Sequence, residues 1–194
     1  MKQIILDDLY RYEGVSCKSL KIKLRYILFN PGFQFTYFFR KATYSKNRFN
    51  IFIWSALHRF SMWKFGFQIP IGTKIGRGFR ISHFGTIIIN GKAIIGNNFN
   101  IASGTLIGYS DGKNKGVPTI GDNVILNVNS VIVGNVKIGD NVLIAPNTFV
   151  NFDVPENSIV IGSPGRIISR DSSPTAKYII YSVKNESFTS NKHP

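Results

Sequence analysis

The chain has 194 residues with a formal net charge of +14, and 43% of its residues are hydrophobic. This composition supplies enough apolar side chains for a packed core and excludes general disorder. The single cysteine, Cys17, excludes an internal disulfide framework. The first apolar run is short and closely followed by Asp7 and Asp8, unlike a signal peptide. We therefore expect a protein of a reducing, cytoplasmic compartment.

Most of the positive charge lies in the N-terminal third of the chain. Residues 1–66 hold 12 Lys/Arg against 3 Asp/Glu, a net charge of +9. A basic, aromatic surface suggests an anionic partner, either nucleic acid or a membrane face. The sequence has no zinc-ligand spacing, no helix-turn-helix pattern and no ribonucleoprotein-type motif. We therefore expect no nucleic-acid partner.

Residues 1–66 predict a basic, aromatic-rich helical region. A short polar helix is expected first, with a turn at Gly14, and Pro31 is suited to open a later helix. A further helix is expected from Phe49 to Trp63, and no apolar run reaches the roughly 20 residues that span a bilayer. The aromatic side chains fit a contact with an anionic membrane. They fit equally the cap of the next domain or a contact with a sister subunit.

Residues 67–168 carry a repeat with a period of six, interrupted by a two-residue slip after Ile87 and a longer insertion after Ile107. The thirteen recurring aliphatic positions are Ile69, Ile75, Ile81, Ile87, Ile95, Ile101, Ile107, Ile120, Leu126, Ile132, Ile138, Ile144 and Val150. This period fits neither an amphipathic helix nor a half-buried strand. It is typical of a parallel β-helix, whose coils bury their apolar sides by stacking.

The end of the repeat predicts a closing element and a tail. Residues 159–168 indicate a closing strand and a turn, and residues 169–194 indicate a polar, loose tail apart from Tyr178 to Val183. The insertion between Ile107 and Ile120 has the composition of an exposed loop. Such loops on a solenoid often lie on its binding face.

Three histidines are present, His58, His83 and His193, and His83 alone lies inside the repeat. It follows the inward-facing Ile81 by two positions, so its side chain is expected to point off the coil. A neutral imidazole is well suited to take a proton from a hydroxyl at cellular pH. A solvated surface histidine is the ordinary alternative. One histidine in the coil cannot supply a three-histidine zinc site, so we expect no metal.

The segment 73–83 (TKIGRGFRISH), with Gly85 and 87–89, resembles the active-site coil of serine acetyltransferases. It resembles still more their relatives that O-acetylate sugars of bacterial capsule, exopolysaccharide and lipopolysaccharide. The resemblance covers about residues 67–168 and includes IVGNVKIG and the closing GSPGRI. It implies a mainly β fold, a left-handed parallel β-helix of triangular section with an α-helical N-terminal region. It also implies a homotrimer with active sites between subunits.

The resemblance further implies acetyl-CoA as co-substrate and assigns residues to its site. His83 is the general base. Val128 and Pro146 occupy small-residue contact points of the coenzyme, and Tyr109 begins the loop near the thioester. Arg166 is a candidate for a coenzyme phosphate, since a guanidinium suits that geometry, with a solvated charge as its alternative.

Two departures argue against serine as the acceptor. Serine acetyltransferases carry an Asp fifteen residues before the catalytic His and another directly before it, where this chain has Gln68 and Ser82. Gln68 is able to orient the ring of His83 by hydrogen bonding but cannot stabilise the imidazolium by charge. The Arg-His pair of their extruded loop, which holds the carboxylate of the amino acid, is replaced by Lys115-Gly116-Val117-Pro118.

The sequence therefore favours an acetyl-CoA-dependent O-acetyltransferase acting on a hydroxyl of a bacterial surface-polysaccharide sugar. The alternatives are a serine O-acetyltransferase of cysteine biosynthesis and a non-catalytic trimeric scaffold. Because surface glycans are assembled on lipid carriers, we expect peripheral contact with the inner face of the membrane. The sequence identifies neither the sugar nor its hydroxyl.

Overall fold

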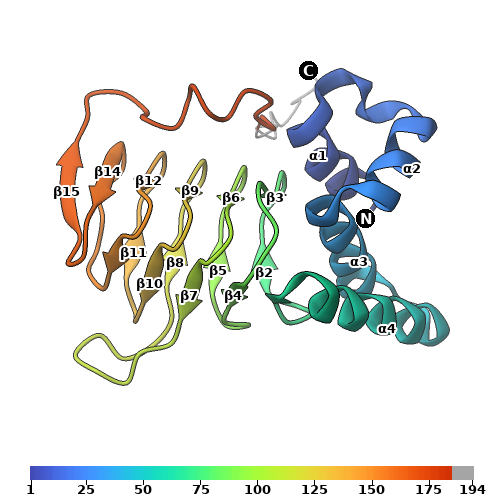
Figure 1. Ribbon diagram of the computed structural model, residues 1–194, viewed down its shortest axis with the longest axis horizontal. Helices are drawn as coiled ribbons and strands as arrows, with labels where there is room; N and C mark the ends of the chain where they lie inside the picture. Colours follow the sequence, from blue (N-terminus) through green and yellow to red (C-terminus); the bar gives the residue numbers. More distant parts are fainter. Residues whose placement is uncertain (185–194) are drawn as a thin grey trace, which may run out of the picture.

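The computed structural model describes residues 1–184, with helices at one end of a coil of short strands (Figure 1). The helices are α1 (Lys2–Glu13), the 3-10 turn η1 (Gly14–Lys18), α2 (Leu20–Phe29), α3 (Pro31–Tyr44) and α4 (Arg48–Phe65). The strands are β1 (Phe67–Gln68), β2 (Lys74–Ile75), β3 (Arg80–Ile81), β4 (Ile87–Ile89), β5 (Ile94–Ile95), β6 (Asn100–Ile101), β7 (Leu106–Gly108), β8 (Thr119–Ile120), β9 (Ile125–Leu126), β10 (Val131–Val133), β11 (Lys137–Ile138), β12 (Leu143–Ile144), β13 (Phe149–Val150), β14 (Ser158–Ile161) and β15 (Arg166–Ser169).

Local sequence signals set where α3 begins and where α4 begins and ends. The Asn30 side chain accepts a hydrogen bond from the backbone N–H of Phe33 at 2.9 Å, and Pro31 follows it at the first helical position. Asn47 caps α4 in the same way, and Gly66 ends that helix with a left-handed φ of 74°. The predicted helix start at Pro31 is therefore confirmed.

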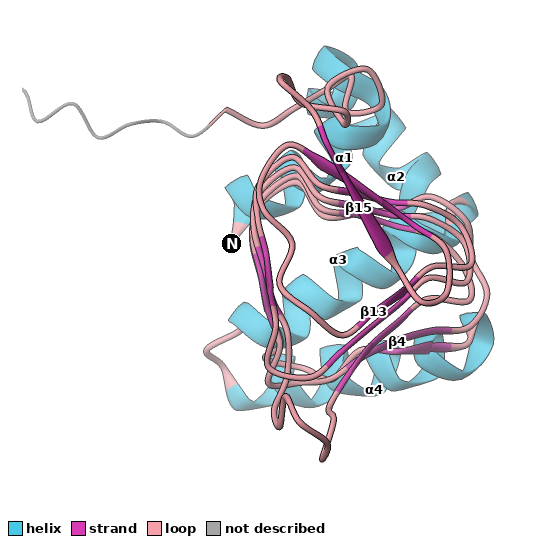
Figure 2. Cartoon of the chain, turned by 90° about the vertical axis from the view of Figure 1, so that its left-hand side faces the viewer, coloured by secondary structure: helices cyan, strands magenta, loops and turns pink. Residues whose placement is uncertain are grey.

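The strands build a parallel β-helix of triangular cross-section (Figure 2). Each turn adds one strand to each of three sheets, ordered β1-β4-β7-β10-β13, β2-β5-β8-β11 and β3-β6-β9-β12-β14. The thirteen aliphatic positions of the six-residue repeat are all buried, with exposed fractions of at most 5%. The prediction of a β-helix is confirmed. The description as mainly β is wrong for the whole chain, because strands of two to four residues hold fewer residues than the helices.

Asparagines turn one corner of the coil. Asn98, Asn123, Asn141 and Asn157 have φ values of 53–58°, a left-handed conformation that Asn tolerates better than most residues. Their side-chain amides form a ladder along the coil, with hydrogen bonds of 3.1, 3.1 and 3.0 Å between successive members. The corner is thus held by side chains as well as by the backbone.

Polar groups of α1 and α3 cover the N-terminal edge of the coil. The Asp8 carboxylate accepts the backbone N–H of Phe79 at 2.8 Å and pairs with Arg40 Nε at 2.8 Å. Arg40 also donates to the carbonyl groups of Ile75 and Gly76 at 2.7 and 2.6 Å. These contacts satisfy backbone groups that an uncovered edge would leave free.

Aromatic side chains close the same end of the coil. Phe35 and Phe39 of α3 are fully buried and share one hydrophobic core with Phe65, Phe67 and the coil. The interpretation that aromatics of residues 1–66 cap the β-helix is therefore confirmed for these side chains. The division at residue 66 into separate domains stays a prediction, since the two regions share this core.

The C-terminal end is closed differently. Strand β15 pairs antiparallel with β14, and the chain then runs back along the coil toward the helices (Figure 1). Val183 exchanges two hydrogen bonds with the Asn98 side chain, at 2.7 and 2.9 Å, and Thr175 and Ile179 are buried. The described part of the tail thus contacts the coil at these residues, and the loose tail expected after residue 168 stays a prediction. His193 lies outside the described residues.

Candidate active site

A groove of about 540 Å³ lies along the outer face of the sheet that holds β3, β6, β9 and β12. Its lining residues are Arg80, Ser82, His83, Asn100, Ala102, Ile125, Leu126, Asn127, Val128, Leu143, Pro146 and Tyr178. Tyr178 comes from the returning tail, whereas the others come from successive turns of the coil. The groove therefore runs parallel to the axis of the coil.

The strand period explains why these side chains meet. In each short strand the aliphatic residue faces the core, so its two neighbours face outward. Arg80 and Ser82 flank Ile81 in this way, and Asn100 and Ala102 flank Ile101 one turn later. The same repeat that builds the core therefore builds the floor of the groove.

His83 lies at the corner between β3 and β4, where its side chain is exposed and lines the groove with Ser82. The imidazole is reachable from solvent, as a base that receives a proton from a substrate must be. Gln68 is exposed on β1 but does not line the groove, and no hydrogen bond joins it to His83 within residues 1–184. Its role in orienting the imidazole stays a prediction.

Of the predicted coenzyme contacts, Val128 and Pro146 line the same groove as His83. They occupy matching corner positions on adjacent turns, after β9 and β12 respectively. The structure therefore brings the predicted base and these two positions together on one face of one chain.

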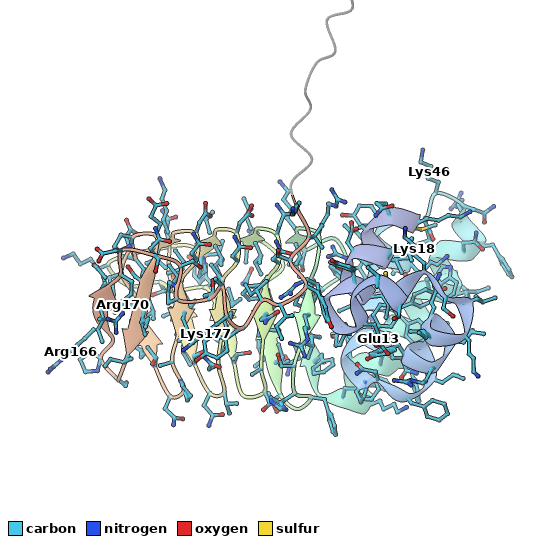
Figure 3. All side chains as sticks on the ribbon, turned by 90° about the horizontal axis from the view of Figure 1, so that it is seen from above. Glu13, Lys18, Lys46, Arg166, Arg170 and Lys177 are labelled. Carbon is cyan, nitrogen blue, oxygen red and sulfur yellow. The ribbon has the colours of Figure 1, made fainter. Side chains whose placement is uncertain are left out.

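Tyr109 and Arg166 lie elsewhere. Tyr109 belongs to the loop between β7 and β8, where its hydroxyl donates to the Asp111 carboxylate at 2.9 Å and Lys115 pairs with Asp111 at 3.2 Å. Arg166 projects from the far end of the coil (Figure 3). Neither residue lines the groove of its own chain, so their contacts with the coenzyme stay predictions.

Among the groove residues that were not predicted as site residues from the sequence are Arg80, Asn127 and Tyr178. The signal for Arg80 and Asn127 was present, because each directly flanks an inward-facing aliphatic position in the sheet that carries His83. No local signal points to Tyr178, since its place depends on the return of the tail over the coil.

The groove is electropositive at its His83 end. None of its lining residues is acidic, and Arg80 contributes a guanidinium. Arg11 lies beside it, and burial together with the charge of Arg80 lowers the pKa of Arg11 to about 10. Burial raises the pKa of Tyr12, whose ring lies 5.3 Å from the Arg80 guanidinium, so this phenol stays protonated. The site favours an anionic ligand.

Within residues 1–184 no cluster of three or more His, Cys, Asp or Glu is arranged to hold a metal ion. In the same part of the chain, no helix combines the length and the apolar character needed to cross a bilayer.

Comparison with known proteins agrees with this geometry. Residues 118–151 match the family model described as bacterial transferase hexapeptide (six repeats). The coil resembles the hexapeptide-repeat structures of serine acetyltransferases. The chain is 36% identical over 129 residues to a serine acetyltransferase of Bacillus licheniformis, covering 66% of this chain and 58% of that protein. It is 38% identical over 103 residues to the putative colanic acid biosynthesis acetyltransferase WcaB of Escherichia coli K12, covering 53% of this chain and 64% of that protein.

Solved structures show the same fold. The serine acetyltransferase of Neisseria gonorrhoeae in complex with serine has a TM-score of 0.69 and 25% identity, covering 87% of this chain and 69% of that one. The serine acetyltransferase of Brucella abortus in complex with coenzyme A has a TM-score of 0.68 and 23% identity, covering 88% and 67%. These similarities support the left-handed hexapeptide β-helix. The chain spans less than two thirds of the length of the curated relatives described above.

Proposed function

We propose that the protein is an acetyl-CoA-dependent O-acetyltransferase acting on a hydroxyl of a bacterial surface-polysaccharide sugar. The observation that carries this proposal is the groove itself, in which His83 shares one face of the coil with Val128 and Pro146. The similarity to WcaB, which is named for colanic acid biosynthesis, supports a sugar acceptor. The named serine acetyltransferases support the acetyl transfer.

In the proposed reaction, neutral His83 accepts the proton of the acceptor hydroxyl while its oxygen attacks the thioester carbonyl. Backbone N–H groups at the site stabilise the tetrahedral oxyanion. Its collapse breaks the carbon–sulfur bond, and the His83 imidazolium returns the proton to the departing thiolate. A positioned base of this kind contributes about 10²–10⁴ in rate.

The spacing of the turns indicates where the acetyl donor, acetyl-CoA, would lie along the groove. Adjacent strands lie about 4.8 Å apart, so Val128 and Pro146, two and three turns beyond the strand that precedes His83, lie about 10 and 14 Å along the axis. An extended coenzyme arm laid over these turns brings its thioester to His83. We infer that the acetyl group enters from the C-terminal end of the coil.

Serine is the leading alternative acceptor, because serine acetyltransferases are prominent among the similar proteins. Gln68 and Ser82 stand where those enzymes carry carboxylates, which disfavours this alternative. Release of free coenzyme A with L-serine, compared with release in the presence of the surface glycan of the host, decides between the two. The proposal is wrong if only L-serine supports turnover.

A non-catalytic scaffold is the other alternative. His83→Ala, compared with Lys92→Ala on an exposed turn outside the groove, distinguishes it from an enzyme. Equal thioester cleavage by both variants with the true acceptor indicates a scaffold. Mass spectrometry of the host glycan with and without the gene then reports whether an acetyl group is lost.

The proposed enzyme works as a homotrimer with sites between subunits. Phe84, directly after His83, exposes 65% of its surface in the single chain, a position that suits coverage by a neighbouring copy. Light scattering that shows a monomer with full turnover contradicts this arrangement. The site and the assembly are therefore tested separately.

We further propose that the cytoplasmic enzyme contacts an anionic membrane through α4. Phe49, Phe52, Phe60 and Trp63 are each at least 60% exposed and recur at helical spacing along one side of the helix. Exposed basic residues, among them Lys46 (Figure 3) and Arg59, flank this stripe. Aromatic side chains beside cations suit the headgroup layer. Flotation with anionic vesicles at physiological salt tests the contact.

A further inference from the structure

The guanidinium of Arg80 is a positive charge at the groove, and no acidic group of the described residues pairs with it. Its Nε atom is buried and has no hydrogen-bond partner, and its guanidinium makes no ion pair within residues 1–184. The contact it does make is with the ring of Tyr12, 5.3 Å from the guanidinium carbon. The side chain also lines the groove beside His83. The arrangement holds Arg80 in place while leaving its charge for something else.

The neighbouring arginines show what a satisfied guanidinium looks like in this region. Arg40 pairs with Asp8 and two backbone carbonyls. Arg77 pairs with Asp7 at 2.6 Å, and Arg11 donates to the Asn100 side chain at 2.6 Å. Both nearby carboxylates are thus already engaged. A desolvated donor without an acceptor is costly, which favours a ligand that supplies one.

The position of Arg80 assigns this ligand group to the acceptor rather than to the coenzyme. Arg80 and His83 are three residues apart, about 10 Å of extended chain across the first turn. Val128 and Pro146 lie on later turns, toward the opposite end of the groove. A group bound at Arg80 therefore sits beside the reacting hydroxyl, on the side that faces the helices.

We propose that Arg80 is a specificity residue that binds an oxyanion of the acetyl acceptor, either the carboxylate of an acidic sugar or the phosphate of a phosphorylated sugar. The guanidinium fork suits both, because each presents two oxygen atoms in one plane. This inference rests on the proposed function, and it narrows the acceptor from any surface sugar to an anionic one.

The test uses three acceptors of similar size: a neutral hexose glycoside, the corresponding hexuronic acid and the hexose 1-phosphate. Arg80→Met keeps the contact with Tyr12 but removes the charge, and Arg80→Lys keeps the charge but removes the fork. Lys92→Met serves as the matched control on an exposed turn. Release of free coenzyme A is measured against the concentrations of acceptor and of acetyl-CoA, and thermal unfolding confirms that each variant folds.

We expect Arg80→Met to raise the KM for the anionic acceptor about 10- to 100-fold, the range for a hydrogen bond to a charged group. The KM for acetyl-CoA and the rate with the neutral acceptor change by a smaller factor than the KM for the anionic acceptor, and Arg80→Lys falls between. Whichever anionic acceptor, the hexuronic acid or the hexose 1-phosphate, shows the raised KM identifies whether Arg80 binds a carboxylate or a phosphate. Equal losses with neutral and anionic acceptors, or a raised KM for acetyl-CoA alone, overturn the inference.

Binding separates this inference from the proposed function. Calorimetry with the hexuronic acid and with the hexose phosphate reads the Arg80 site without any turnover. Binding that is lost in Arg80→Met, without acetyl transfer, leaves the anion site intact and rejects the acetyltransferase. Acetyl transfer that depends on His83 but not on Arg80 rejects the anion site alone. If no acidic probe binds in an Arg80-dependent way, the inference fails.

Discussion

Two hollows within residues 1–184 have similar volumes and each contains a histidine, but their linings differ. The groove on the coil, about 540 Å³, is lined by an arginine, asparagines and the exposed His83. The hollow between α4 and the first turn, about 530 Å³, is lined mainly by apolar side chains and includes the buried His58. Only the first presents an imidazole that a substrate can reach.

The chemical state of His58 follows from its burial. Its ring lies 5.1 Å from that of Phe35 and 6.0 Å from that of Phe39, and burial lowers its pKa to about 4. A hydrogen bond with the backbone of Ile69 acts against this shift without reversing it. His58 is therefore neutral at cellular pH and belongs to the packing between helix and coil. The comparison shows that placement decides which histidine is a candidate base.

Replacing each histidine in turn is expected to give the largest difference in kcat between the two hollows. His83→Ala is expected to lower kcat about 10²- to 10⁴-fold, because the acceptor hydroxyl loses its base. His58→Phe keeps an aromatic ring in the core and leaves kcat within a few-fold of its original value. Coenzyme A release at saturating substrates measures both. Loss of activity in His58→Phe with an intact fold would contradict the assignment of His83 as the base, because it would indicate that the hollow at His58 takes part in the reaction.

The polar cap between helices and coil is expected to have the next largest effect. Burial raises the pKa of the Asp8 carboxyl, and the Arg40 guanidinium acts against that rise. Arg40→Met leaves this carboxylate buried and unpaired, so we expect a loss of about 3–5 kcal/mol in the free energy of unfolding. Urea titration measures it. A second change, Asp8→Leu, removes the uncompensated charge and should recover part of the loss; an additive result contradicts the coupling.

A pH effect of about 3 kcal/mol is expected from His58. Because its pKa is lower in the folded chain, about 4, than the 6.5 of an ordinary histidine, the unfolded chain binds more protons between these values. Stability is therefore fully present above about pH 6.5 and is lost as the pH falls toward about 4. Urea titrations at pH 7 and pH 4.5, on the original chain and on His58→Phe, isolate this contribution. If the free energy of unfolding depends on pH equally in both proteins, groups other than His58 cause the loss of stability.

The two hollows also mark what the sequence predicts well and what it does not. The six-residue repeat places Ile81 in the core and so leaves its direct neighbour Ser82 outside, because alternation is a local property of a strand. His83 and Val128 follow at the corners after β3 and β9, where they line the groove. The pairing of Asp8 with Arg40 has no such local signal, since it joins residues far apart in sequence. Burial of His58 likewise depends on how α4 packs against the coil. Sequence reasoning therefore predicted several side chains of the groove, but it did not predict the contacts that hold the helices against the coil.

The apolar hollow on α4 gives the smallest expected effect on stability. Phe52 and Trp63 line it yet are 74% and 79% exposed, so their replacement by Ser should change the free energy of unfolding by no more than about 0.5 kcal/mol. If this surface meets a membrane, the double variant binds anionic vesicles markedly less than the original chain while keeping its turnover with a water-soluble acceptor. Leu24→Ser on α2, another exposed apolar position, is the matched control. Unchanged flotation together with a smaller assembly in light scattering would assign the stripe to contact between copies, because burial against protein and burial in lipid predict opposite results here.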